Sequence, residues 1–469
     1  MEQFFHLKEH RTSVRREFVA GLTAFMAMAY ILIVNPSMFA AEFGSDYFDA
    51  VYISTSISAV VGTLMMGLFA KLPLSQAAGM GINAFFVNTV CHEFGFTYAN
   101  ALVLVLFDGI LFLLLTATGL RKHILEAIPT SVKTAISAGI GLFIAFLGLQ
   151  SAGLLEIGNG TISLHSFNIF PSLHGTATWA QVMPLLIAVI AIIAIGIISK
   201  KGVRGAVLWG IVGSAAVYYI VGLISVDGFA DGISGSMSVN IFAPFEKFAD
   251  LSLFAVFREG FDFSAFIEAN GMGNFIIALL TTTISFCLVD MFDTLGALYG
   301  ACTCGGLVKN DGSIPKLEKA MTADAVATCV GAVCGCSPVT TFVESAAGIA
   351  EGGKTGLTAV FTALLFFLAM FIAPIAKLIP ACATAAALVY VGILMMGCVR
   401  DIDWDDPSAA VPAFLTVSMI PFTNNISFGI AFGMIASIAI SVFTGKIRDV
   451  KLGTWLIGIL FTVMFFVSK

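Results

Sequence analysis

The chain has 469 residues, of which 58% are hydrophobic and 11% are charged, and its formal net charge is -6. A soluble domain carries charge on about a quarter of its residues, so this composition excludes a water-facing exterior. No basic run points to nucleic acid as a partner. We therefore expect an all-α protein that is embedded in the lipid bilayer.

Apolar runs close to the ~20 residues that cross a hydrocarbon core recur along the whole chain. They predict fourteen transmembrane segments. The segments are 17–37, 50–70, 76–92, 99–119, 132–152, 180–199, 206–226, 274–300, 320–335, 338–352, 355–378, 382–399, 408–422 and 426–444. A further apolar stretch, 453–467, is short for a crossing, and whether it crosses or lies in the interface stays open.

Loop charges predict the orientation, because Lys and Arg concentrate in cytoplasmic loops. With residues 1–16 in the cytoplasm, only Lys247, Arg258 and Lys377 fall in outer connections. This predicts a multi-pass protein of the plasma membrane with a cytoplasmic N-terminus. Residues 445–469 are expected to form a cytoplasmic or interfacial C-terminal segment.

The fourteen segments divide into two sets of seven, 17–226 and 274–444, joined by an extracellular connection at 227–273. Because each set has an odd number of crossings, the second set has the opposite orientation in the membrane, as an inverted repeat requires. The third segment of each set is short and rich in Gly, Ala, Ser and Pro, at 73–83 and 338–348. Such interrupted segments predict a binding site, because their free backbone groups must face ligand, water or protein. Close helix crossing through small residues is the alternative.

Two carboxylates lie deep in the eighth segment, at Asp290 and Asp293. Three-residue spacing places them on one helical face, and such a pair disfavours joint ionisation. One of the two is therefore expected to carry a proton; a hydrogen-bonded pair without a role in transport is the alternative. An ionisable group at membrane depth is a functional hypothesis by default.

Polar groups also mark the two short segments. Glu344 stands beside Thr340, Thr341 and Ser345, where a carboxylate can accept two adjacent N–H donors of a ring lactam or amidine. A surface position is the alternative. Asn83 offers a donor and an acceptor to a flat heteroaromatic solute, and a backbone cap would have the same sequence.

Two further acids receive no functional role. Asp108 is isolated among apolar residues, and Asp324 lies near the start of the ninth segment, where interfacial solvation is expected. No Lys or Arg lies within segments three, eight or ten, which weighs against an anionic solute unless helix N-termini replace the cation.

Cofactor chemistry is not expected. The six His lie in or near predicted loops and segment ends, and the nine Cys have no plausible metal-ligand spacing. An intramembrane enzyme would need a nucleophile with its base, or a metal set, so no catalytic residues are assigned.

Four ordered motifs carry a family resemblance. They are Gly21-Leu-Thr-Ala-Phe-Met-Ala-Met-Ala-Tyr30-Ile-Leu-Ile-Val-Asn35-Pro36, Ala78-Gly-Met-Gly-Ile-Asn83-Ala-Phe-Phe86, Val289-Asp290-Met-Phe-Asp293-Thr-Leu-Gly296 and Val343-Glu344-Ser-Ala-Ala-Gly348 with its Gly-rich continuation to Gly356. Over nearly its whole length the chain resembles the nucleobase:cation symporter family, in its purine permease branch of hypoxanthine/guanine and adenine permeases.

The resemblance implies a seven-plus-seven inverted repeat with core and gate domains, a homodimer through apolar gate helices, and proton-coupled transport. By motif matching, it implies that Asn83, Asp290, Asp293 and Glu344 are substrate-binding and proton-coupling residues. With Thr341, which stands beside Glu344, we expect Glu344, Asn83, Asp290 and Thr341 to bind substrate and Asp293 and Asp290 to couple the proton. Adenine permeases tend to carry Asn at the position of Asp290, so this residue favours hypoxanthine or guanine.

The expectation is a proton-coupled importer of a neutral purine. An anion carrier of similar architecture, for sulfate or bicarbonate, and an ion channel are the alternatives.

Overall fold

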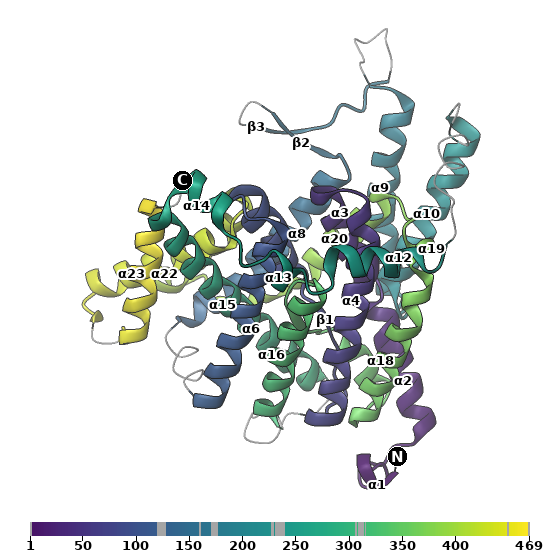
Figure 1. Ribbon diagram of the computed structural model, residues 1–469, viewed down its shortest axis with the longest axis horizontal. Coiled ribbons are helices and arrows are strands. Elements are labelled where there is room, and N and C mark those ends of the chain that lie inside the picture. Colours follow the sequence, from purple (N-terminus) through teal and green to yellow (C-terminus); the bar gives the residue numbers. More distant parts are fainter. Residues whose placement is uncertain are drawn as a thin grey trace.

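In the computed structural model the chain is mostly helical (Figure 1). The structure describes residues 2–119, 128–158, 161–169, 177–226, 229, 240–304, 307, 314, 316–447 and 450–467. Residues 227–228 and 230–239 of the predicted connection, and 448–449 and 468–469 of the predicted C-terminal segment, lie outside these ranges.

The described helices before the connection are the short α1, within the predicted N-terminal residues 1–16, and helices that match predicted segments one to seven. They are α1 (Glu2–Phe5), α2 (Val14–Met28), α3 (Ile31–Phe43), α4 (Asp46–Met65) with the π-turn η1 (Met66–Ala70), α5 (Met80–Ala84) with η2 (Phe85–Glu93), α6 (Tyr98–Thr118), α8 (Thr130–Ser151), α9 (Trp179–Lys200) and α10 (Ala206–Ser225). The first predicted segment consists of two helices, because the chain turns at Ala29 and Tyr30 between α2 and α3.

The predicted connection contains short helices. They are α12 (Ala243–Lys247), η4 (Phe248–Ser252), α13 (Ala255–Arg258) and α14 (Ser264–Asn270). The later helices match predicted segments eight to fourteen and the terminal stretch. They are α15 (Met272–Cys304), α16 (Leu317–Cys334), α17 (Ser345–Ala350), α18 (Gly356–Ala369) with η5 (Met370–Ile372) and α19 (Ala373–Ala376), α20 (Ala381–Met395) with η6 (Met396–Asp401), α21 (Pro407–Phe422), α22 (Ile426–Phe443) and α23 (Leu452–Val467).

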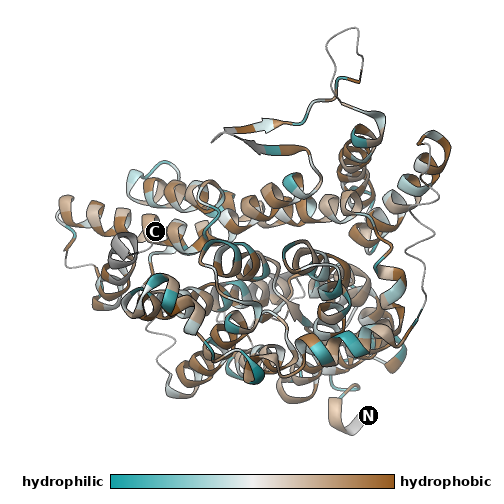
Figure 2. Ribbon diagram, turned by 45° about the horizontal axis from the view of Figure 1, so that its top comes forward, coloured by the Kyte–Doolittle hydropathy of each residue, from teal (hydrophilic) through white to brown (hydrophobic). Residues whose placement is uncertain are grey.

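Counting α2 and α3 together as one span, Val14–Phe43, ten helical spans of the described residues are long and apolar enough to cross a bilayer, which makes the chain a multi-pass membrane protein. Figure 2 shows hydrophobic residues along the outer helices as well as inside the molecule. On α9 and α10, Ile190 is 61% exposed and Ile224 is 82% exposed. Such exposure of large aliphatic side chains suits contact with lipid. The count of fourteen crossings stays a prediction.

The prediction of an all-α chain misses two small antiparallel sheets. Strands β2 (Leu155–Gly158) and β3 (Thr161–Leu164) form a hairpin at the edge of the molecule (Figure 1). Strands β1 (Gln76–Ala78) and β4 (Val339–Thr341) lie in the interior and come from the two interrupted segments.

The pairing of β1 with β4 satisfies part of the backbone that the two interruptions leave free. Gln76 faces Thr341 and Ala78 faces Val339, and the ladder is extended by the N–H of Gly79, which donates to the Pro338 carbonyl at 3.0 Å. The hydroxyls of Thr63 on α4 and Thr328 on α16 satisfy the outward N–H and C=O groups of Gln76 and Val339. Since unpaired backbone is costly away from water, this ladder lets non-helical chain lie at the centre of the protein.

Helices pack on both sides of the ladder through small residues. A Cβ on Gly62 of α4 would lie 2.9 Å from Gln76 Oε1, and one on Gly331 of α16 would lie 3.0 Å from Val339 Cγ2. Hydrogen atoms at these two positions therefore allow α4 to approach β1 and α16 to approach β4 closely.

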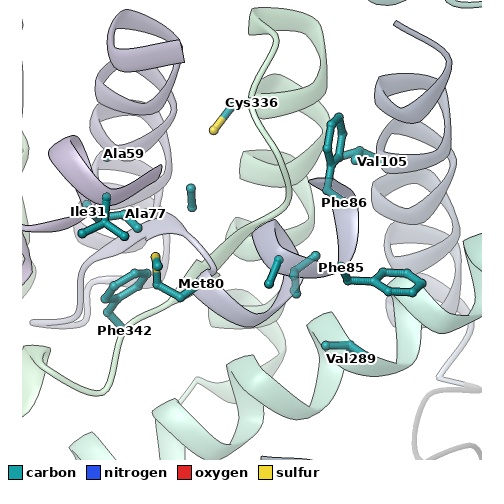
Figure 3. Close-up of a cluster of buried hydrophobic side chains, with 14 of the residues drawn as sticks. Ile31, Ala59, Ala77, Met80, Phe85, Phe86, Val105, Val289, Cys336 and Phe342 are labelled. Carbon is teal, nitrogen blue, oxygen red and sulfur yellow. The ribbon is translucent and has the colours of Figure 1, made fainter. Parts of the chain in front are cut away.

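Aromatic residues fix the segment that follows β1. Phe86 packs on Phe39 of α3 with ring centroids 5.2 Å apart, and Phe85 packs on Phe286 of α15 at 4.9 Å. Figure 3 shows Phe85 and Phe86 on this segment, together with Val289 and Val105. Edge-to-face and tilted ring pairs hold η2 between α3 and α15.

A buried carboxylate anchors α2 to the start of α18. Glu17 is fully buried, and it accepts hydrogen bonds from the backbone N–H of Lys354 at 3.1 Å and of Thr358 at 3.2 Å, as well as from the Thr355 hydroxyl at 3.0 Å. The unpaired N–H groups at the N-terminus of a helix stabilise negative charge. Glu17 therefore has a structural explanation separate from the central ladder.

Candidate functional site

A cavity of about 200 Å³ opens beside the ladder. One wall comes from the α2–α3 turn, the interrupted segments and α15; the other comes from α8, α20 and η6. The described lining residues are Tyr30, Met80, Gly81, Ser137, Asp293, Ala297, Thr340, Thr341, Phe342, Val343, Glu344, Val391, Leu394, Met395 and Cys398. Both interrupted segments thus contribute to one cavity, as the sequence predicts for a binding site.

Glu344 lies at the N-cap position of α17, directly after the ladder, and lines this cavity. The buried Tyr30 donates its hydroxyl proton to Glu344 Oε1 at 2.9 Å. This bond orients the carboxylate while it remains part of the cavity wall. The surface position that the sequence left open for Glu344 is therefore not the one observed.

Asp293 lines the same cavity from α15. Thr340 of β4 donates its hydroxyl proton to Asp293 Oδ2 at 3.2 Å. Gly79 approaches both groups, because a Cβ there would lie 2.8 Å from Thr340 Oγ1 and 3.4 Å from Asp293 Oδ2. The ladder and α15 are thus joined at a point where the chain has no room for a side chain.

Thr341 turns its hydroxyl away from the cavity and toward Asp324 of α16. Asp324 Oδ1 accepts from Thr341 at 3.2 Å and from the Gln76 amide at 2.9 Å, and Oδ2 accepts from Thr294 at 2.8 Å. Asp324 is fully buried, so the expectation of interfacial solvation is wrong. The missed signal is Thr328, four residues on, which marks a polar face on this helix.

The carboxylate of Asp324 is expected to stabilise the fold by holding these three donors. Replacing Asp324 by Leu would leave buried donors unpaired, at a cost of about 1–3 kcal/mol each. Thermal unfolding of purified protein in detergent should therefore show a clear loss of stability, whereas Glu318→Gln, at an exposed position on the same helix, should show almost none. An unchanged midpoint for the Asp324 variant would contradict this reading of the network.

Asp290 lies one helical turn before Asp293 but has different partners. It is fully buried, its Oδ2 accepts from Thr328 at 3.4 Å, and its Oδ1 has no hydrogen-bond partner among the described residues. It is not among the residues that line the cavity. The predicted pair is therefore divided, with Asp293 facing the cavity and Asp290 facing α16.

Asn83 also lies outside the lining of the cavity. It is fully buried, and its Oδ1 accepts a hydrogen bond from the hydroxyl of Ser337, which precedes the second interrupted segment. This contact joins segments 254 residues apart in the sequence. Asn83 thus ties the two interruptions together at the end of the ladder away from Glu344.

The lining of the cavity is apolar with two acids. Asp293 and Glu344 are its charged residues among the described ones, and Met80, Phe342, Leu394 and others supply apolar surface. Carboxylates accept hydrogen bonds, and aromatic and thioether groups contact flat rings favourably. The cavity can therefore receive a small, flat, neutral solute that carries N–H donors.

A second cavity, of about 290 Å³, lies between α3, η2, α8 and α20. Its charged lining residue among the described ones is Glu42, whose Oε1 lies 3.1 Å from His92 Nδ1. It contains none of the predicted site residues, so we place the candidate site in the first cavity.

Comparison with known proteins identifies the family. Residues 15–432 match the model of the Permease family named Xan_ur_permease. The chain belongs to this permease family. The resemblance to nucleobase permeases is confirmed, and a permease is a transporter, which agrees with the expectation that the chain is not an enzyme.

Curated relatives match this permease along its length. It is 37% identical over 472 residues to the guanine/hypoxanthine permease PbuO of Bacillus subtilis, covering 99% of this chain and 100% of the relative. It is 32% identical over 467 residues to the adenine permease AdeP of Escherichia coli, covering 98% and 95% of the two chains.

Solved structures share the fold of the permease. The transmembrane domain of the cyanobacterial bicarbonate transporter BicA matches 90% of this chain and 97% of its own, with a TM-score of 0.59 and 14% identity. A murine Solute Carrier 26 anion transporter in the inward-facing state matches 92% of this chain and 68% of its own chain, with a TM-score of 0.58 and 12% identity. At such identities the likeness concerns the fold alone.

Proposed function

We propose that the chain is a secondary active transporter that imports a purine nucleobase, hypoxanthine or guanine, by proton symport. One observation carries the proposal: the two interrupted segments share a cavity that presents Glu344 and Asp293 beside apolar walls. The N–H edge of a lactam base matches a carboxylate acceptor, and its flat ring matches Met80 and Phe342. The names of the relatives PbuO and PbuG, both guanine/hypoxanthine permeases, support this substrate class.

The proposed roles differ among the site residues. Glu344, oriented by Tyr30, binds the N–H edge of the base, and Asp293 exchanges the coupling proton together with Asp290. Thr341, which lines the cavity from β4, contributes to substrate binding. Asn83 and Asp290 do not line the cavity here, so their part in substrate binding is to hold the interrupted segments and α15 around it.

The proposed architecture is the seven-plus-seven inverted repeat with a cytoplasmic N-terminus, divided into core and gate. The antiparallel pairing of β1 with β4 supports it, because two matched segments meet in opposite directions. The core would hold α2 to α6 and α15 to α19, and the gate would hold α8 to α10 and α20 to α22. Relative movement of the two around the cavity would give alternating access, and gate helices would form a homodimer in the membrane.

The anion carrier is the less favoured function. BicA and the murine transporter share the fold, but the described lining of this cavity carries two acids and no Lys or Arg. A buried anion beside two carboxylates would need a compensating positive charge. No specific observation favours an ion channel.

Purified protein in liposomes is expected to take up labelled hypoxanthine with saturation, driven by an inwardly directed proton gradient. At one proton per base, each pH unit should support about tenfold accumulation. Excess guanine should compete, whereas uracil, sulfate and bicarbonate should not. Uptake that is indifferent to a collapsed gradient would contradict proton symport, and transport of sulfate or bicarbonate without purine uptake would restore the anion carrier.

A further inference from the structure

Asp108 is a buried acid that the proposed site does not use. It lies near the middle of α6, it is fully buried, and neither of its carboxyl oxygens has a hydrogen-bond partner among the described residues. An ionised carboxylate with no hydrogen-bond donor is strongly disfavoured in a protein interior. Packing alone gives no reason for an acid at this position.

Close packing of α6 on α16 directs Asp108 toward other acids. A Cβ on Gly109, the next residue, would lie 2.6 Å from Cys329 Sγ and 3.3 Å from the Ala325 carbonyl oxygen. Asp324 adjoins Ala325 on α16, and Asp290 accepts a hydrogen bond from Thr328, which adjoins Cys329, so all three acids flank this contact. Among the described residues, neither Asp108 nor Asp290 forms an ion pair with Lys, Arg or His.

Protons are the ligands that this cluster suits. Neighbouring carboxyl groups disfavour joint ionisation, because like charges repel. No group of His, Cys, Asp and Glu suited to a metal ion occurs among the described residues. Both Asp108 oxygens and Asp290 Oδ1 have no hydrogen-bond partner among the described residues. A carboxylic acid on one of these residues can pass its proton to a carboxylate on the other through a bridging water.

The cluster connects with the cavity through the ladder and α15. Asp324 accepts hydrogen bonds from Gln76 and Thr341, which belong to the two interrupted segments. Asp290 lies one turn before Asp293, which lines the cavity. Direct hydrogen bonds and one helical turn therefore join the carboxyls behind the ladder to the residues that line the cavity.

We propose that Asp108 is a proton-binding residue of the transport cycle that exchanges its proton with the Asp290 and Asp324 carboxyls behind the ladder. In each exchange an O–H bond on one carboxyl breaks, an O–H bond on the other forms, and the negative charge moves in the opposite direction. Asp108 thereby extends the proton pathway into α6, outside the interrupted segments. This inference rests on the proposed proton-coupled purine transport.

The test compares Asp108→Asn with the unaltered protein in liposomes, using labelled hypoxanthine. Two quantities are measured: exchange of hypoxanthine at equal pH, and accumulation driven by an inward proton gradient of about two pH units. Asn keeps the size of the side chain but binds no proton, so exchange should keep its KM within about twofold while driven accumulation falls at least about tenfold. Accumulation equal to that of the unaltered protein would overturn the proposal.

Two further variants separate a proton role from a structural one. Thr282→Val removes another buried, unpartnered polar group, on α15, and should leave accumulation unchanged. Asp108→Glu retains a titratable carboxyl and should restore accumulation, with a pH profile displaced by at least about half a unit. If the Asn variant does not fold, an unaltered pH profile for the Glu variant overturns the proposal. Absence of proton-driven purine uptake by the unaltered protein overturns the proposed function and this inference with it.

Discussion

Replacing Glu344 by Gln is expected to reduce saturable purine uptake by about 10- to 100-fold, with normal expression and folding. Gln keeps the shape of Glu and can still accept from Tyr30, whose hydroxyl lies 2.9 Å from Oε1. It replaces an acceptor with an amide N–H₂ that opposes the N–H donors of a lactam base. The loss of a hydrogen bond to a charged group, about 1.5–3 kcal/mol, sets this range, since 1.4 kcal/mol corresponds to a factor of ten.

The measurement is initial uptake of labelled hypoxanthine over a range of concentrations. Tyr30→Phe serves as the matched comparison, because it removes the bond that orients Glu344 and leaves the carboxylate in place. A smaller loss is expected for Tyr30→Phe than for Glu344→Gln. Unchanged uptake by Glu344→Gln would reject the binding role of this carboxylate.

Adding a single methyl group at Gly79 is expected to impair both stability and transport. The Cβ of Ala would lie 2.8 Å from Thr340 Oγ1 and 3.0 Å from Thr340 Cγ2. Rotation of Thr340 cannot relieve the contact, because both branches of this stiff side chain face the new atom. Gly79→Ala should therefore displace Thr340 from Asp293, lower stability by about 1–3 kcal/mol and reduce uptake about tenfold.

Gly273→Ala is the matched control for Gly79→Ala. It makes the same chemical change on α15, at a position where an added Cβ meets nothing within 4 Å. Thermal unfolding in detergent and hypoxanthine uptake should both remain close to those of the unaltered protein. Equal stability and equal uptake for the two variants would show that the close packing at Gly79 is not required for transport.

The local pattern of apolar and small residues was sufficient to predict the positions of the helices and of the interrupted segments. Each predicted crossing from 17–37 to 426–444 corresponds to a helix or an interrupted segment, because hydrocarbon requires apolar runs of nearly constant length. The small residues and Pro at 73–83 and 338–348 marked where helix would fail. The sequence could not show that each interruption forms a strand with the other, since their pairing joins residues 265 apart, such as Gln76 and Thr341.

The candidate site was partly visible in the sequence. Glu344 and Asp293 were selected because acids at membrane depth need a reason, and both line the cavity. The prediction of solvation for Asp324 was wrong, because its position near a segment end does not determine its burial. The helix α16 packs against both β4 and α6, and these contacts bury Asp324. Asp108 had no assigned role until its neighbours were known.

The sequence by itself determined that this chain is a membrane protein and that two matched segments are interrupted. It also showed which few acids lie at membrane depth. Composition and spacing carry that information, because the bilayer penalises charge and unpaired backbone wherever they occur. The tertiary structure alone decided the partner of each polar group: β1 with β4, Tyr30 with Glu344, Asp324 with Gln76. Hydrogen bonds between distant segments depend on packing in three dimensions, which no local pattern specifies.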